Sequence, residues 1–308
     1  MALEVFILGT GGMMPLPNRF LTSVLVRREG ELMLFDCGEG TQVALKRLNL
    51  RWKRISSIFI SHTHADHVTG LPGILMLSSQ VARSEPLYIY GPPRIREYVE
   101  TTRQILDMYI NYEIVIKEIQ EEGQIFKGEG FKVEAFFLKH SKPCVGYTVE
   151  EDLRPGIFYP EKALALGVPR GPLWSRLQAG HGVRTESGRA VQPEEVLGPA
   201  RRGTKFSFVT DTLPVDSITA WIKNSDLFIC EGMFTEDLAE SALEKKHLTA
   251  RQAAGLARAG EVKSLGLIHY SPRYTAKDLA QLLAEAQAIF PETFLTRDRQ
   301  VIELKNPI

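Results

Sequence analysis

Long apolar runs and paired cysteines are both missing from this sequence. No run approaches the ~20 apolar residues that a membrane-spanning helix needs. The first residues, MALEVFILGTGG, contain no basic stretch and favour a strand over a signal peptide. The three cysteines, Cys37, Cys144 and Cys230, are odd in number and far apart, which argues against a disulfide framework and suits a reducing compartment. We therefore expect a cytoplasmic protein.

The chain also lacks an excess of either charge, because 37 Lys and Arg balance 37 Asp and Glu. This excludes a globally basic nucleic-acid binder but not a local basic patch. Residues 153–205 provide such a patch, with nine Lys or Arg against four acids, and they also hold six of the 17 prolines and eight of the 25 glycines. The segment is either a disordered surface insertion or an arm that grips a polyanion, and its charge favours the arm.

Short apolar runs that end in polar or Gly-rich turns predict buried strands, with helical stretches between them. The expected strands are 3–9, 31–36, 56–61, 87–91, 131–139, 204–211, 226–232 and 264–270. The expected helices are 41–50, 94–109, 249–260 and 276–290. Because strands and helices interleave over all 308 residues, the sequence predicts an α/β layered fold.

Three of the seven histidines stand in one loop, SHTHADHVTG (61–70), directly after an expected strand. In this loop His62, His64 and His67 surround Asp66. Imidazole and carboxylate groups suit Zn²⁺ and related ions. The H-x-H-x-D-H spacing can aim the first two histidines at one ion and the Asp-His pair at a second. A purely structural role for so dense a cluster would be unusual, so the loop predicts a metal site.

Three further candidate ligands lie at the ends of other expected strands, namely His140, Asp211 and His269. Taken singly, each could be a turn former or a buried hydrogen-bonding residue. Together with the loop they provide five histidines and two aspartates, enough for two metal ions. Two ions ~3.5–4 Å apart lower the pKa of a shared water toward ~7 and supply a hydroxide at neutral pH. The pattern therefore predicts a two-metal hydrolase of esters or phosphodiesters.

These motifs resemble the ribonuclease Z family, the tRNA 3′-processing endonucleases of the metallo-β-lactamase superfamily. The resemblance covers almost the whole chain, and its motifs are FDCGEGTQ (35–42), SHTHADHVTGLPG (61–73), HSKPCVGY (140–147), TDT (210–212), HLT (247–249) and HYSPRY (269–274). GVPRGPLWSRLQAG (167–180) resembles the Gly/Pro-rich arm with which that family holds the tRNA elbow. The resemblance implies an αββα sandwich in which 153–205 is an inserted, flexible exosite arm. It also implies an endoribonuclease that removes 3′ trailers from precursor tRNA.

The resemblance also implies roles for single residues. One zinc ion would be bound by His62, His64 and His140, the other by Asp66, His67 and His269, with Asp211 as the bridge; other divalent ions are possible. Asp66 would accept the proton of the nucleophilic water. His247 would help to protonate the leaving 3′ oxygen, or else be an ordinary residue ahead of the Thr249 cap. Asp36 would brace the metal loop, or else be a simple turn former, and Glu231 would orient His247. The residues expected to contact substrate are Arg19, Arg170, Arg176 and Arg273.

Two segments depart from the family pattern. In PLPNRF (15–20), the loop that resembles a P-x-K-x-R-N motif, Pro15 and Arg19 remain but the lysine and asparagine do not. The resemblance implies that this loop senses the tRNA 3′ end, so discrimination against CCA-bearing tRNA stays open. In CEGMF (230–234), Cys230 is either a soft metal ligand or, as we expect, a buried structural cysteine.

Two other functions stay open at this point. The same fold could serve a small-molecule hydrolase of cyclic phosphodiesters, aryl sulfates, thioesters or lactones. The chain could also be an RNA-binding scaffold with a silent metal site, although the full set of ligands argues against this. The family resemblance finally implies a homodimer in which the arm of one subunit serves the active site of the other.

Overall fold

The computed structural model describes residues 3–80 and 83–305, which divide into two compact units. Unit 1 consists of the chain up to residue 150 together with residues 204–305, and unit 2 consists of residues 151–203. The second unit begins and ends two residues earlier than the segment expected from composition. None of the helices in the described ranges is both long and apolar enough to cross a membrane.

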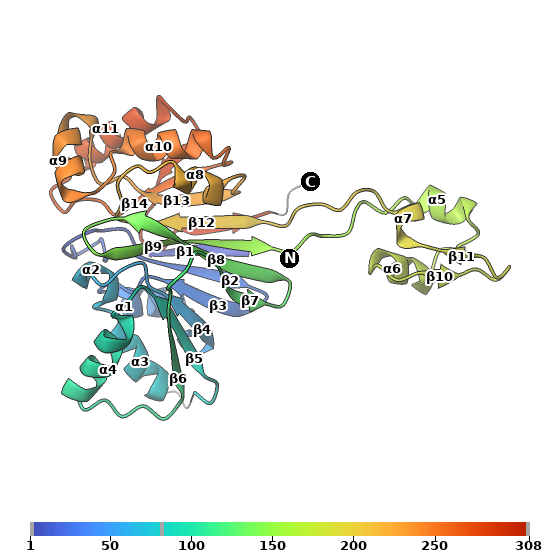
Figure 1. The fold of residues 1–308 in the computed structure, drawn as a ribbon, viewed down its shortest axis with the longest axis horizontal. Coiled ribbons are helices and arrows are strands. Elements are labelled where there is room, and N and C mark those ends of the chain that lie inside the picture. Colours follow the sequence, from blue (N-terminus) through green and yellow to red (C-terminus); the bar gives the residue numbers. More distant parts are fainter. Residues whose placement is uncertain (1–2, 81–82, 306–308) are drawn as a thin grey trace. The chain divides into compact units, whose positions relative to one another are not determined.

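Unit 1 contains two seven-stranded sheets that face each other (Figure 1). The first has the order β16-β1-β2-β3-β4-β5-β6, with β16 (Val301–Leu304), β1 (Leu3–Gly9), β2 (Ser23–Arg28), β3 (Glu31–Phe35), β4 (Ile55–Phe59), β5 (Leu87–Gly91) and β6 (Ile114–Glu118). The second has the order β15-β14-β13-β12-β9-β8-β7, with β15 (Thr293–Leu295), β14 (Leu265–Ile268), β13 (Leu227–Glu231), β12 (Lys205–Val209), β9 (Pro143–Glu151), β8 (Phe131–Lys139) and β7 (Gly123–Gly128). Strands β3 to β6 pair in parallel, and so do β12 to β15.

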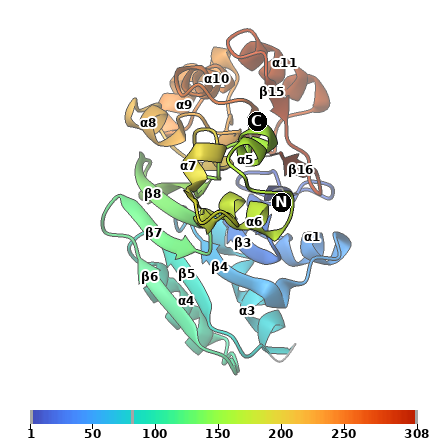
Figure 2. The same ribbon diagram turned by 90° about the vertical axis from the view of Figure 1, so that its right-hand side faces the viewer.

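Helices cover the outer face of each sheet (Figures 1 and 2). Those beside the first sheet are α1 (Thr41–Arg47), α2 (Ala65–Val68), α3 (Leu71–Gln80) and α4 (Ile95–Ile105), with the 3₁₀ turn η1 (Trp52–Arg54). Those beside the second are α8 (Ser217–Ile222), α9 (Ala239–Lys245), α10 (Ala250–Ala259) and α11 (Ala276–Gln287), with η2 (Glu236–Leu238). The order of layers is therefore helix, sheet, sheet, helix, which confirms the expected αββα sandwich.

The hydrophobic core has three layers that match this order. A central cluster joins the two sheets, and in it the ring of Phe35 lies 5.0 Å from Phe59 of the same sheet and 5.7 Å from Phe206 of the other, measured between ring centroids. Two outer clusters join each sheet to its helices. Because both faces of both sheets are covered, the parallel strands read in the sequence as continuous apolar runs. The loops at their carboxyl ends are left to carry polar groups.

All eight expected strands and all four expected helices are present, with differences at their ends. Helix α1 ends at Arg47 instead of residue 50, α4 spans Ile95–Ile105 instead of 94–109, and α11 ends at Gln287 instead of 290. Helix α10 starts behind Thr249, whose hydroxyl accepts a hydrogen bond from the Gln252 N–H, so the expected N-cap is confirmed.

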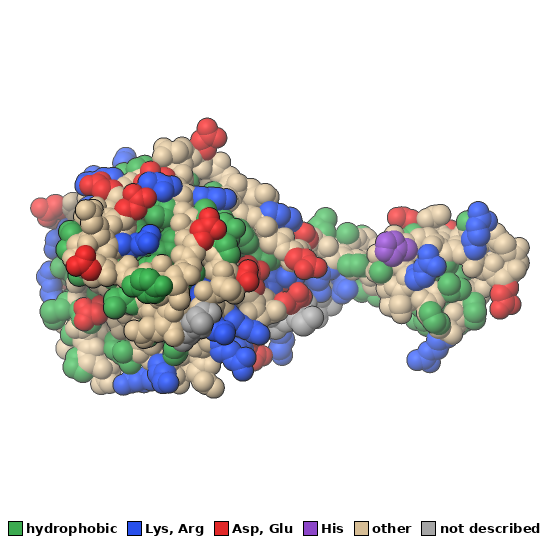
Figure 3. All heavy atoms as spheres, turned by 90° about the horizontal axis from the view of Figure 1, so that it is seen from below, with side chains coloured by type: hydrophobic (Ala, Val, Ile, Leu, Met, Phe, Trp, Pro, Cys, Tyr) green, Lys and Arg blue, Asp and Glu red, His purple; other side chains and the backbone are tan. Residues whose placement is uncertain are grey.

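Unit 2 contains short elements around a small core of its own. They are α5 (Pro160–Ala165), α6 (Pro172–Gln178), β10 (Val183–Arg184), β11 (Ala190–Val191) and α7 (Pro193–Val196). Their buried side chains form one cluster, in which the Trp174 ring packs 5.2 Å from Phe158 and its Nε1–H donates to the Val168 carbonyl oxygen. On the face of unit 2 seen in Figure 3, the Lys and Arg side chains lie apart from one another.

Candidate metal centre and active site

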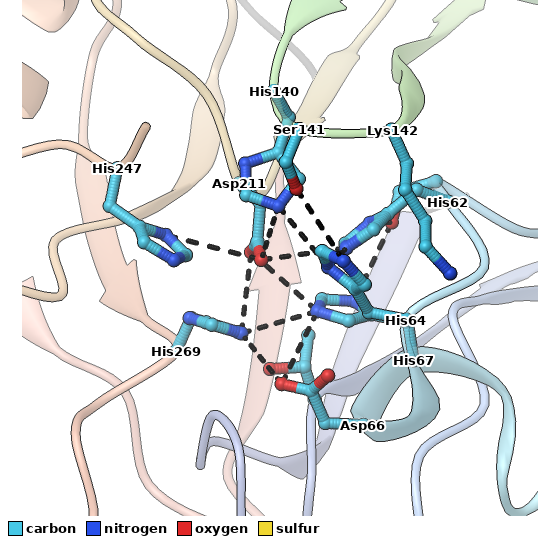
Figure 4. A network of polar contacts seen from close by, with 12 residues as sticks. His62, His64, Asp66, His67, His140, Ser141, Lys142, Asp211, His247 and His269 are labelled. Carbon is cyan, nitrogen blue, oxygen red and sulfur yellow. Dashed lines mark hydrogen bonds and ion pairs between the residues drawn. The ribbon is translucent and has the colours of Figure 1, made fainter. Parts of the chain in front are cut away.

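The loops at four strand ends of unit 1 bring the predicted ligands together (Figure 4). The loop after β4 supplies two of the histidines and leads into α2, whose first turn supplies an aspartate and a third histidine. The loops after β8, β12 and β14 supply one residue each. All seven side chains meet there, namely His62, His64, Asp66, His67, His140, Asp211 and His269.

The first group of donor atoms consists of three histidine nitrogens and one carboxylate oxygen. The Nδ1 atom of His64 lies 2.9 Å from His62 Nε2 and 3.2 Å from His140 Nε2. The Oδ2 atom of Asp211 lies 3.5 Å from His62 Nε2 and 3.7 Å from His140 Nε2. Ring nitrogens that converge on one carboxylate oxygen are the donor set that a divalent transition metal prefers.

The second group uses the other oxygen of the same aspartate. Asp211 Oδ1 lies 3.5 Å from His67 Nε2 and 3.3 Å from His269 Nε2. The Oδ2 atom of Asp66 lies 3.3 Å from His269 Nε2 and 3.7 Å from His67 Nε2. One carboxylate thus presents each of its oxygens to a different set of histidines, which is the arrangement of a bridging ligand.

Two properties of this cluster fit bound cations. Asp211 is 2% exposed, and its Oδ1 makes no hydrogen bond within the described residues despite the nearby ring nitrogens. A buried carboxylate oxygen without a donor is costly unless a positive charge faces it. Burial also lowers the pKa of both His64 and His140 to about 4, so their imidazoles are neutral, which is the form that binds metal. The residues present therefore fit bound divalent cations.

Asp36 holds the metal loop from behind. Its Oδ1 accepts the Ser61 backbone N–H at 2.7 Å, and its Oδ2 lies 2.7 Å from Nδ1 of His67. A hydrogen bond at Nδ1 turns Nε2 of the same ring toward the cluster and fixes which nitrogen is free. Asp36 is fully buried and has a positive φ of 53°, a strained backbone that these contacts maintain.

Two supporting groups are backbone atoms that the sequence analysis did not identify. The Met13 N–H donates to Asp66 Oδ2 at 2.7 Å, and the Lys246 carbonyl oxygen lies 2.9 Å from Nδ1 of His140. Both Met13 (φ 63°) and Lys246 (φ 59°) adopt the left-handed conformation. Every residue has a backbone carbonyl and nearly every residue a backbone N–H, so no pattern of side chains predicts these contacts from the sequence.

His247 and Glu231 form a pair at the edge of the cluster. The Nδ1 atom of His247 lies 2.9 Å from Glu231 Oε2, and the other oxygen of Glu231 accepts the Thr212 N–H at 2.7 Å. Although burial acts to lower it, the Glu231 carboxylate raises the pKa of His247 to about 9. The imidazole is therefore protonated at neutral pH and can donate a proton. Its Nδ1 lies 3.9 Å from Asp211 Oδ2.

The candidate substrate residues lie in different places. Arg273 is exposed and lines a cleft of about 510 Å³ that also contains Asp66 and His247. Arg19 is instead used within the protein, where its guanidinium donates to the Ser271 carbonyl oxygen at 3.3 Å and lies 5.6 Å from the Tyr270 ring centroid. Arg170 and Arg176 are exposed on unit 2.

Cys230 takes no part in the cluster. It is fully buried, belongs to the hydrophobic layer between the second sheet and its helices, and is absent from the groups of metal-binding side chains found among the described residues. Of the two roles considered for it, the structural one agrees with this packing.

The chain is similar over nearly its whole length to proteins of the ribonuclease Z family. Ribonuclease Z of Treponema denticola is 63% identical over 305 residues, which cover 99% of both chains. Ribonuclease Z of Borrelia duttonii is 44% identical over 306 residues, or 97% of this chain and 96% of that protein. The crystal structure of the short form of human tRNase Z superimposes with a TM-score of 0.70 at 26% identity, covering 99% of this chain and 100% of that one. A family model described as anti-Pycsar protein Apyc1 matches residues 3–154.

The Asp36 contacts predict a measurable effect on metal binding. We expect Asp36→Asn to weaken zinc binding by roughly 10- to 100-fold, because an amide no longer fixes the His67 ring as a carboxylate does. Competition with a chromophoric chelator measures this affinity. Asp216→Asn, at an exposed aspartate that makes no side-chain cap hydrogen bond, is the matched control. Equal zinc affinities in the two variants would contradict the role of Asp36.

Proposed function

The chain belongs to the ribonuclease Z family as a tRNA 3′-processing endonuclease, and we propose that it removes 3′ trailers from precursor tRNA with two bound zinc ions. It is a metal-dependent endoribonuclease that hydrolyses phosphodiester bonds of precursor tRNA. Two relatives named ribonuclease Z are 63% and 44% identical over nearly the whole chain. This similarity favours tRNA over a small ester or lactone as the substrate. The complete donor set disfavours a scaffold with a silent metal site.

The main observation in support of two bound zinc ions is the orientation of the Asp211 carboxylate. It presents Oδ2 to one set of histidines and Oδ1 to another. His62, His64 and His140 would hold one ion, and Asp66, His67 and His269 the other. Bound zinc supplies Lewis-acid chemistry, since it lowers the pKa of water and draws the negative charge of the phosphodiester.

Asp66 is placed to take the proton of the attacking water. The neighbouring histidines outweigh burial and hold the pKa of this carboxyl well below its usual range, so it is ionised and free to accept hydrogen bonds. The Met13 N–H, 2.7 Å from Oδ2, restrains the orientation of the carboxylate. A restrained acceptor beside the reacting phosphate needs little reorganisation during proton transfer.

His247 is placed to donate the second proton, to the leaving 3′ oxygen of the tRNA. It lines the same cleft as Asp66, and Glu231 keeps it protonated. Glu231 is itself fixed by the Thr212 N–H, directly after the bridging Asp211. Thr212, which holds Glu231, and the bridging Asp211 are therefore adjacent residues of one loop.

Unit 2 of a partner subunit would bind the tRNA body. We also propose that the protein is cytoplasmic. Exposed cations on unit 2, among them Arg170 and Arg176, suit the phosphate contacts that dominate RNA affinity. A groove of about 760 Å³ on unit 1, lined by Phe20, Val43 and Met76 among others, is an apolar face that a second copy would cover. The three free, buried cysteines suit the reducing cytoplasm.

The function is tested with a trailer-bearing precursor tRNA, with and without a chelator, comparing the wild type with Asp211→Ala. We expect the wild type to release the trailer only when metal is present. The variant should release none, because both sets of histidines lose their shared carboxylate. Gel analysis of the products measures the released trailer. Full activity in the variant would contradict the two-metal assignment.

The role of His247 is tested by changing the leaving group. We expect His247→Ala to lower kcat on precursor tRNA by roughly 10²–10⁴-fold, the usual value of a general acid. Hydrolysis of bis(p-nitrophenyl) phosphate should fall far less, because nitrophenolate leaves without being protonated. Glu231→Gln should show the same selectivity in weaker form. Equal losses on both substrates would instead mean that His247 supports the structure of the centre.

Complementation tests the dimer and the arm together. Asp211→Ala subunits keep an intact unit 2, while subunits with Arg170→Ala and Arg176→Ala keep an intact metal centre. If unit 2 serves the partner's active site, an equal mixture after subunit exchange should recover about a quarter of wild-type tRNA cleavage, because half of the dimers then have one complete site. No recovery above the separate proteins would contradict action between subunits.

A further inference from the structure

Two cavities of unit 1 adjoin the histidine cluster along the same two loops. The cleft of about 510 Å³ is lined by His64 and Ser141, among others. A second cavity of about 280 Å³ is lined by Thr63 and Lys142, the residues next to these two in the sequence. The two cavities therefore share the loops that carry His64 and His140.

In the view of Figure 4, His247 and Lys142 lie on opposite sides of the cluster, with Asp211 between them. The two cavities would therefore bind different parts of the substrate. The leaving 3′ oxygen that His247 would protonate belongs to the tRNA body, so the body occupies the cleft. The trailer keeps the attacked phosphorus and must leave on another side of the cluster.

The small cavity has the side chains of a phosphate and ribose site. Each residue that lines it carries a hydrogen-bonding side chain, and α4 contributes the hydroxyls of Thr101 and Thr102. The Tyr98 hydroxyl, on the same helix, instead donates to the Val68 carbonyl oxygen at 2.9 Å. The Nζ atom of Lys142 donates to the Thr63 carbonyl oxygen at 3.0 Å and has no carboxylate partner in the described parts of the chain. Hydroxyl and cationic donors of this kind contact nucleic-acid backbones without reading sequence.

A second cation, Arg94, lines the cavity together with one acid. Its Nε and Nη2 atoms are 2.8 and 3.1 Å from the two carboxylate oxygens of Glu97, and both side chains are largely exposed. The Nη1 group of Arg94 has no partner within the described residues. The carboxylate thus aims the guanidinium, and also offsets part of the charge that a phosphate would meet.

We propose that this cavity binds the backbone of the 3′ trailer, with Lys142 and Arg94 contacting phosphates beyond the one that is cut. The proposal rests on the proposed function, because it takes the tRNA body to lie on the His247 side. It assigns to these residues a role in binding the released product, which is separate from metal binding and from proton transfer.

The test compares two precursor tRNAs that differ only in the trailer, one with a single nucleotide and one with a long trailer. We expect Lys142→Gln and Arg94→Gln each to raise KM for the long-trailer substrate by roughly 5-fold, and to raise it much less for the short one. The slope of log KM against log salt concentration should also fall by about 0.7 for each phosphate that the variant no longer binds. Lys223→Gln, at an exposed lysine outside both cavities, is the matched control.

Glu97→Gln supplies a change in the opposite direction. Among the described residues Glu97 is the only acid that lines the cavity. Its neutralisation frees Nε and Nη2 of Arg94 for phosphate, so KM for the long-trailer substrate should fall below that of the wild type. Damage to the neighbouring metal centre cannot produce such a gain. Unchanged KM ratios in all three variants would overturn the proposal, and so would equal losses on both trailers and on bis(p-nitrophenyl) phosphate. A wild type that cuts neither precursor but hydrolyses the small diester would refute the proposed function instead.

Discussion

The buried carboxylate of Asp211 is the group on which the rest of the centre depends. It follows β12 in the second sheet, yet its two oxygens face histidines that follow β4 in the first sheet and β8 and β14 in its own. A carboxylate so deeply buried is stable only if positive charge faces it. The two sheets must therefore pack in one relative position, and the aromatic cluster around Phe35 joins rings from both sheets at their interface.

Much of this architecture could be predicted from the sequence, for a physical reason. Parallel strands covered on both faces read as unbroken apolar runs, so β4, β5, β12, β13 and β14 were recognisable at once. Ligands at strand ends follow these runs directly, as Asp211 and His269 do. Two of the strands that were not identified are of another kind, whereas β2 and β9 were not identified although they are central and mostly buried. Strand β6 (IVIKE) and β7 (GQIFKG) lie at sheet edges, are half exposed and carry charged residues, so their patterns resemble loops.

The remaining parts of the site could not be read from residue types. Met13 and Lys246 act through backbone atoms in left-handed conformations, and any residue offers the same groups. The composition of unit 2 indicated a Gly/Pro-rich insertion, but not that six small apolar side chains would close a core within it. The motif that includes Arg19 predicts a substrate contact, which stays a prediction, and it gave no sign that the guanidinium also contacts Tyr270 and Ser271.

That use of Arg19 joins the altered loop to the reaction centre. The connection between β1 and β2, which contains this loop, is tied to the segment after β14 by Arg19 and by the Gly12 N–H, which donates to the Tyr270 carbonyl oxygen at 3.0 Å. Gly12 also lies against His269 so closely that a β-carbon at this position would stand 2.5 Å from the ring. The next residue, Met13, donates its N–H to Asp66 Oδ2. The segment that holds the altered loop is therefore in direct contact with the Asp66 carboxylate and with the His269 ring.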